Sequence, residues 1–293
     1  MEFPVSRGYE IELIAFKKIK DKDNSPFDIG IEIVEFDFVF YNLIDRVNSK
    51  IKQYCHKVES EHQFNEPNLF DSEGNHYSSY GIEVISYPYR KISFITNKLI
   101  STIQETSSLL NKEGFVLSND FKDSSILSQY LEFSSHYIAN HYHFNIGDLK
   151  KLQPKLLERL ILFFNHSFNV ELLKNWYGRD YYLYTSPTFI YSLEEAHNLI
   201  SKIKNSKLNI VSIKNNGKTL ELRGFISPFY YSKEAEVISE IVETTDSQLT
   251  TLISGIAETN NSDLLIDSNK KLYYLIKEFI KWRKNLEEKF KNR

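Results

Sequence analysis

The stretch Asn140-His141-Tyr142-His143-Phe144-Asn145 alternates polar and aromatic residues. This period of two is typical of a β-strand, in which successive side chains point to opposite faces of the sheet. His141 and His143 therefore share one face, and Tyr142 and Phe144 share the other. Two neighbouring imidazoles can bind a metal ion or a phosphate, whereas the alternative is an aromatic strand whose histidines only face water.

Three other stretches repeat the pattern, with apolar residues on one face and ionisable residues on the other. The ionisable members are Glu10 and Glu12 in residues 7–14, Glu83 in residues 80–88, and Glu221 with Arg223 in residues 219–225. An antiparallel sheet with one helix-covered face and one open face produces such alternation. We therefore expect an α+β fold whose open face gathers these side chains.

Helical spacing of apolar residues predicts the covering layer. Amphipathic helices are expected over residues 42–57, 92–110, 154–164, 233–258 and 263–291. Residues 27–41 alternate like strands after a turn cluster, which predicts one long strand or a hairpin. Glu32, in Gly30-Ile31-Glu32, then competes with Glu10 and Glu12 as the opening carboxylate of the sheet.

Composition narrows the class of protein. The 293 residues are 41% hydrophobic, carry a net charge of −3 with interleaved signs, and include one cysteine, Cys55. An internal disulfide is thus excluded, and a reducing compartment is expected. The sequence has neither a basic footprint for nucleic acid nor an apolar run long enough for a membrane span. These features predict a cytoplasmic globular protein that binds neither nucleic acid nor membrane.

The predicted open face has the chemistry of a divalent cation site. Four carboxylates on one surface repel one another unless cations lie between them, and mostly oxygen ligands favour Mg²⁺ or Mn²⁺ over Zn²⁺. Arg223 lies on this face, and Arg179 follows in an aromatic turn, where the alternative is a surface arginine stacked on tyrosine. Divalent metals together with arginines indicate a phosphate-bearing substrate.

The order of these motifs resembles the amidoligase family, part of the carboxylate–amine ligase superfamily of glutamine synthetase and glutamate–cysteine ligase. The resemblance covers roughly residues 7–245 and rests on five short elements: Gly8–Glu12, Gly81–Pro88, His141–His143, Arg179 and Leu220–Phe225. It implies a glutamine synthetase-like curved antiparallel sheet that binds ATP and magnesium on its open face. The chain would be a single catalytic domain, residues 1–293, with a C-terminal helical extension at about 259–293.

The resemblance also implies roles for individual residues. The metal nearer the nucleotide phosphates would be held by Glu10, His141 and Glu221. The metal nearer the acceptor carboxylate would be held by Glu12 and Glu83. The phosphates would be neutralised by His143, Arg179 and Arg223. The groups acting directly in catalysis would be Glu83, Arg179 and Arg223.

The implied activity is ATP-dependent amide formation through an acyl phosphate, with a carboxylate substrate and an amine substrate such as an amino acid, peptide or protein. Alternatives are a metal-dependent phosphohydrolase and a non-catalytic protein that binds a nucleotide or peptide on the same scaffold. A homo-oligomer is possible if the C-terminal helix binds a partner. Contacts to the substrates are expected in loops at residues 59–79 and 116–135.

Overall fold

The computed structural model describes most of the chain as a mixed fold of helices and one antiparallel sheet. The described residues are 3–19, 26–61, 69–118, 126, 139–167, 169, 172–173, 188–204, 210–226, 235–259 and 269–290. The strands are β1 (Arg7–Lys18), β2 (His56–Glu61), β3 (Leu69–Phe70), β4 (His76–Ser86), β5 (Phe115–Leu117), β6 (Ala139–Asn145), β7 (Val211–Lys214) and β8 (Thr219–Ile226). The α-helices are α1 (Pro26–Ile51), α2 (Ile92–Lys112), α4 (Ile146–Leu152), α5 (Leu156–Asn165), α7 (Leu193–Leu199), α8 (Ala235–Glu258) and α9 (Lys270–Phe290). Two short 3-10 helices are η1 (Lys52–Tyr54) and η4 (Asn215–Gly217).

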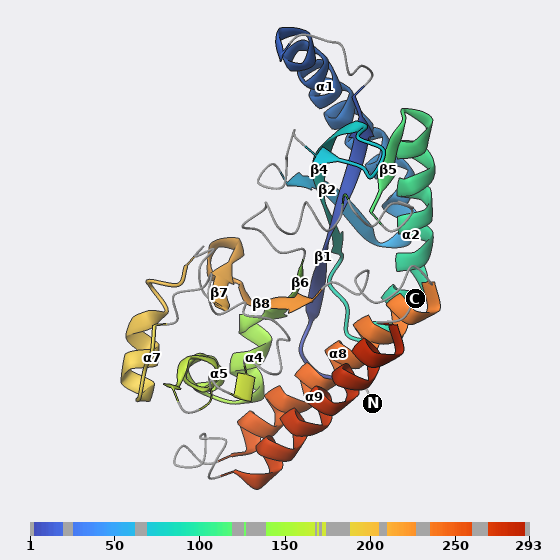
Figure 1. Cartoon of the computed structure of the whole chain (residues 1–293). Coiled ribbons are helices and arrows are strands. Elements are labelled where there is room, and N and C mark those ends of the chain that lie inside the picture. The colour runs from blue at the N-terminus through green and yellow to red at the C-terminus, as the bar shows by residue number, and fades with distance from the viewer. Residues whose placement is uncertain are drawn as a thin grey trace.

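The sheet brings the four predicted strands together as consecutive neighbours. Its strands follow the order β2-β4-β1-β6-β8-β7, while β3 pairs with β4 and β5 with β1. The long strand β1 crosses the centre of the molecule (Figure 1). The pairings between these strands are antiparallel, as the alternating sequences predict. Because β4, β1, β6 and β8 are adjacent, their ionisable residues meet on one surface.

The other face of the sheet supplies the core. Alternate residues of the central strands are almost completely buried there: Tyr9, Ile11, Leu13, Ile82, Val84, Tyr142, Phe144, Leu220 and Leu222. They form one hydrophobic cluster with residues of α1, α2, α5, α8 and α9. This arrangement confirms the expected division between an apolar, helix-covered face and a face with ionisable side chains. Ile14 and Phe16 of β1 are also buried, so the polar part of its other face ends after Glu12.

The expectation of strands over residues 27–41 is wrong, because this segment belongs to helix α1. Phe40, Leu43 and Val47 of this helix are buried against the sheet at helical spacing. Burial of an apolar helical face therefore outweighs the strand preference of the β-branched residues that precede it. Glu32 lies on this helix and is not part of the sheet, so it does not replace Glu10 or Glu12.

Several short strands differ from the expectation. The helix predicted over 42–57 ends at Ile51, and β2 follows in place of the predicted helix end and polar loop. Two further short strands, β3 and β5, occupy segments predicted as loops, and β4 begins at His76. Asn48 of α1 accepts a hydrogen bond from Val58 N–H (2.8 Å) and donates one to Val58 C=O (2.7 Å). The Asn48 side chain therefore pairs with the backbone N–H and C=O of Val58 at the outer edge of β2, as a neighbouring strand would.

The hairpin predicted after residue 208 is present. Strands β7 and β8 pair directly, and η4 joins them with Asn215, Asn216 and Gly217 all at positive φ. Asparagine and glycine tolerate this conformation better than other residues. The hairpin therefore holds Lys214 and Glu221 at fixed register beside β6.

A buried ion pair fixes the beginning of β1 to helix α8. The guanidinium of Arg7 binds Asp246 through two contacts, Nε–Oδ1 at 2.8 Å and Nη2–Oδ2 at 2.9 Å. Tyr89 donates a third hydrogen bond to Asp246 Oδ1 at 3.0 Å. Paired charges of this kind are needed when carboxylate and guanidinium are both excluded from water.

The C-terminal helices α8 and α9 pack side by side (Figure 1). Gly255 permits the close approach, since a Cβ added there would lie 2.9 Å from Leu272 Cδ2. Leu272, Ile276 and Phe279 are buried as predicted, whereas residues 263–268 and residue 291 of the expected helix lie outside the described residues. None of the helices in the described ranges is both long and apolar enough to cross a bilayer.

Candidate functional site

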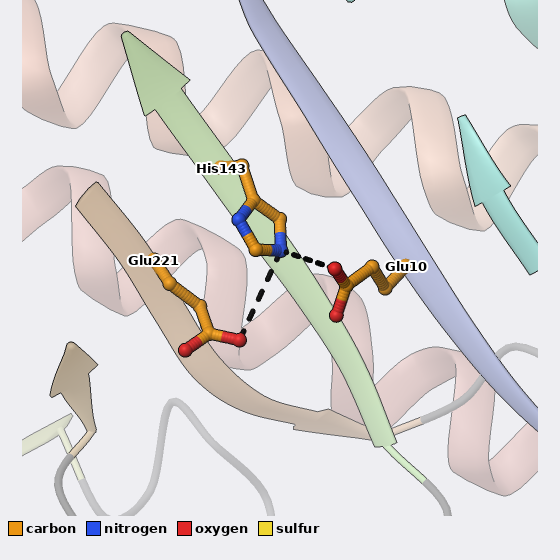
Figure 2. A group of neighbouring side chains, drawn as sticks. All are labelled: Glu10, His143 and Glu221. Atoms are coloured by element: carbon orange, nitrogen blue, oxygen red, sulfur yellow. Dashed lines mark ion pairs between the residues drawn. The ribbon is translucent and has the colours of Figure 1, made fainter. Parts of the chain in front are cut away.

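Three side chains from three adjacent strands converge on the open face. Glu10 comes from β1, His143 from β6 and Glu221 from β8 (Figure 2). His143 Nε2 lies 3.1 Å from Glu10 Oε1 and 3.8 Å from Glu221 Oε1. We call Glu10, His143 and Glu221 the trio. Their ligand atoms all lie within 4.8 Å of one another.

The register explains why His143 and not His141 completes the trio. His141 stands directly opposite Glu10 on β1, and His143 stands opposite Gly8. Long side chains on neighbouring strands also reach diagonal neighbours. Here Glu10 reaches diagonally to His143, which is directly opposite Glu221 on β8.

His141 makes the second diagonal contact. Its Nε2 lies 2.9 Å from Glu12 Oε1, and both side chains are almost fully buried. In the tautomer that donates from Nε2, Nδ1 keeps its lone pair. That Nδ1 is buried and has no hydrogen-bond partner in the part of the chain that the structure describes. Metal-binding histidines commonly donate their other N–H to a carboxylate, so the predicted ligand role of His141 stays a prediction with a compatible geometry.

A second group of carboxylates extends across β1, β4 and β2. Glu12 is directly opposite Glu83, and Glu83 is directly opposite Glu59. Burial, followed by the negative charges of Glu10, Glu12 and Glu61, raises the pKa of Glu83 to about 9. This group of carboxylates therefore repels additional negative charge and favours the binding of a proton or a cation.

Within the trio, by contrast, the neighbouring groups stabilise the charged forms of Glu10 and His143. Burial disfavours the charged form of Glu10, but the contact with His143, together with His141 and Arg223, outweighs burial and lowers the pKa of Glu10 to about 2. Burial likewise disfavours protonated His143, yet Glu10 and Glu221 raise the pKa of His143. A positive charge is thus stabilised at the centre of the trio.

The donor set fits a hard divalent cation. Octahedral Mg²⁺ with bonds of about 2.1 Å places neighbouring ligand atoms about 3 Å apart, close to the 3.1 Å between Glu10 and His143. His143 Nε2 is buried but has no well-directed hydrogen bond among the described residues. The two carboxylates are oxygen ligands of the kind that Mg²⁺ and Mn²⁺ prefer, and the single imidazole is a ligand that also suits transition metals.

Two cations lie on the far side of Glu221. Arg223 Nη1 donates to Glu221 Oε2 at 3.3 Å, and Lys214 Nζ lies 3.6 Å from the same oxygen. The two oxygens of Glu221 therefore have different surroundings. Oε1 faces the trio, and Oε2 faces a positively charged edge formed by β7 and β8.

The structure thus brings seven of the eight predicted site residues onto one face of the sheet, together with residues that were not predicted. Glu10, Glu12, Glu83, Glu221, the two histidines and Arg223 share this face, but His143 takes the place beside Glu10 and Glu221 that was predicted for His141. His141 pairs with Glu12 instead. Arg179 lies outside the described residues. Sequence reasoning missed Lys214, Glu59 and Glu61, for which the available signal was their position at every second residue of short strands.

The fold and site together define a class: an α+β protein with an antiparallel sheet that has one apolar face and one face carrying carboxylates, imidazoles and cations that are buried or half-buried. No protein-family model and no curated protein matches the sequence. Two solved structures show a distant likeness. One is described as a novel glutamine synthase homolog, with 12% identity, a TM-score of 0.36, and coverage of 95% of this chain and 64% of that chain. The other is the complex between the prokaryotic ubiquitin-like protein Pup and its ligase PafA, with 13% identity, a TM-score of 0.25, and coverage of 97% and 58%. The chain therefore spans less than two thirds of either.

Proposed function

We propose that this protein is an ATP-dependent carboxylate–amine ligase that requires Mg²⁺ or Mn²⁺. The observation that carries the proposal is the pair of neighbouring cation-attracting groups on one sheet face. One is the trio, and the other is the Glu12–Glu83 pair with Glu59 beside it. Phosphoryl transfer between two anions needs bound cations of the kind that these groups attract, because donor and acceptor otherwise repel each other.

The residues of the site would bind the cations, contact the phosphates and orient one another. The trio would hold one cation near the nucleotide phosphates, and Glu12 with Glu83 would hold a second near the acceptor. Such ions neutralise phosphate oxygens when they are bound. Arg223 would donate to phosphate oxygens, and its planar guanidinium suits a two-point contact. His141 would orient Glu12 through their hydrogen bond.

The reaction has two displacements. A substrate carboxylate oxygen attacks the γ-phosphorus of ATP, the bond from that phosphorus to the bridging oxygen breaks, and ADP leaves. The amine nitrogen then attacks the acyl carbon, the bond from that carbon to the phosphate oxygen breaks, and inorganic phosphate leaves as the nitrogen loses a proton to solvent. Catalysis depends mainly on positioning and charge neutralisation.

The test is an ADP-release screen with Mg²⁺, ATP and pools of amino acids, polyamines and peptides, followed by mass spectrometry of the product. We expect ADP release that depends on both a carboxylate and an amine, with an amide product. Glu83→Gln should lower the rate on the order of 10²-fold or more, as loss of a charge-stabilising group does. Glu35→Gln, on the exposed side of α1, is the matched control.

Two outcomes would replace the proposal. Phosphate release without an acceptor and without an amide would favour a phosphohydrolase. Metal-dependent nucleotide binding without turnover across the whole screen would favour a binding protein on this scaffold.

A further inference from the structure

Lys214 is a cation beside Glu221 that has no role in the reaction proposed above. It lies at the end of β7, the outermost strand on this side of the sheet, with its side chain 23% exposed. Ser212 on the same strand is directly opposite Glu221, and Lys214 is two residues further along the same face. The ammonium reaches diagonally to Glu221 Oε2 at 3.6 Å.

The position of Lys214 relative to the two cation-attracting groups indicates which part of a bound nucleotide it would contact. The Glu12–Glu83 pair lies on β1 and β4, the trio spans β1, β6 and β8, and Lys214 lies beyond both on β7. In the proposed reaction the transferred phosphoryl group would lie between the trio and the acceptor end at β1 and β4. The remaining phosphates of the nucleotide would then extend towards β8 and β7.

We propose that Lys214 binds the α- or β-phosphate of the nucleotide, the part that is not transferred. This inference rests on the proposed function. The ammonium would leave Glu221 Oε2 to Arg223 and contact a phosphate oxygen held beside the trio. A compact ammonium on a flexible stem suits this exchange between two anionic partners. The competing explanation is that Lys214 only neutralises the buried Glu221 carboxylate.

Nucleotide binding by Lys214→Met separates these roles. The substitution keeps the length of the stem and removes the charge. The probes are the non-hydrolysable ATP analogue AMPPNP, ADP and AMP, each with Mg²⁺ in calorimetric titrations. Lys218→Met is the matched control, since Lys218 is exposed in the same hairpin. Titration with Mn²⁺ in the absence of nucleotide measures the affinity of the trio for a metal ion.

We expect Lys214→Met to weaken AMPPNP and ADP about equally, by about 10- to 100-fold, as loss of a charge-assisted contact does. Lys214→Arg should keep most of the affinity, and Lys218→Met should change little. Mn²⁺ binding without nucleotide should be unchanged or tighter in Lys214→Met, because a positive charge near Glu221 has been removed.

Three results would overturn the inference while leaving the proposed ligase intact. Unchanged affinity for AMPPNP and ADP would leave Lys214 without a nucleotide contact. Weaker Mn²⁺ binding would show that Lys214 supports the trio. Weaker AMPPNP binding with unchanged ADP binding would place the contact at the γ-phosphate. If the native chain bound no nucleotide with Mg²⁺ or Mn²⁺, the proposed function would fail together with the inference.

Discussion

His56 should make the protein lose stability between pH 7.5 and pH 4. The imidazole lies on the core face of β2, where Nδ1 is 2.8 Å from Tyr54 O and Nε2 is 2.8 Å from Tyr9 Oη. A neutral ring protonated at Nδ1 donates to Tyr54 and accepts from Tyr9. A second proton on Nε2 would oblige the Tyr9 hydroxyl to accept instead of donate, and it would place a positive charge in a buried position. Thr102 Oγ1 also lies 3.1 Å from Nδ1.

The magnitude follows from the pKa of His56. Burial is the main cause that lowers this pKa from 6.5 to about 4, and the nearby Lys98 adds to it, although the Tyr54 carbonyl opposes the change. The unfolded chain therefore takes up a proton before the folded chain does. The contribution is complete above pH 6.5 and is lost as the pH falls towards 4. Linkage gives a loss of about 2 kcal/mol at pH 5 and about 3 kcal/mol at pH 4.

The assay is urea unfolding at pH 7.5, 6, 5 and 4 for the native chain and His56→Gln. The variant should be less stable at pH 7.5 because it loses packing and hydrogen bonds, so the comparison uses the difference in slope. Carboxylates such as Glu10 and Glu83 titrate in both proteins and cancel from that difference. His197→Gln, whose side chain is 71% exposed in the native chain, should follow the native slope. Parallel curves for the native chain and His56→Gln would refute the reasoning.

Three further predictions concern the framework and the site. Asp246→Asn should destabilise the protein by about 3–5 kcal/mol in urea unfolding, because it leaves Arg7 buried without its ionic partner; a loss below about 1 kcal/mol would contradict this. Asn48→Ala should cost about 1–3 kcal/mol and increase aggregation measured by light scattering, since Val58 loses both edge hydrogen bonds; unchanged stability and scattering would show that the edge needs no cover. Glu83→Gln should raise the melting temperature of the metal-free protein at pH 8, because a pKa raised to about 9 makes the native carboxyl lose stability as pH rises from 4.5 through 9. An equal or lower melting temperature at pH 8, with no change in its pH dependence, would mean that the carboxylates do not repel one another.

The alternation of residues along the sequence is enough by itself to determine much of the sheet. In β1, β4, β6 and β8 the alternating residues named from the sequence, such as Glu10 with Glu12 and His141 with His143, lie on the face that their positions predict. This succeeds because the two-residue period is a property of the extended backbone itself and needs no tertiary information. The amphipathic helices α2, α8 and α9 are predictable for a similar local reason.

Some features depend on which group lies opposite a residue, on a neighbouring strand or a packed helix. These were decided only by the tertiary structure. Residues 27–41 form a helix because the sheet offers an apolar face for Phe40 and its helical neighbours, which the strand-like spacing before them did not reveal. The partners of His141 and His143 depend on the register between β1 and β6 and on diagonal reach across it. Lys214 gains its place beside Glu221 through strand pairing in the same way. A sequence specifies which face a side chain occupies, whereas the packing of strands and helices specifies which group it meets there.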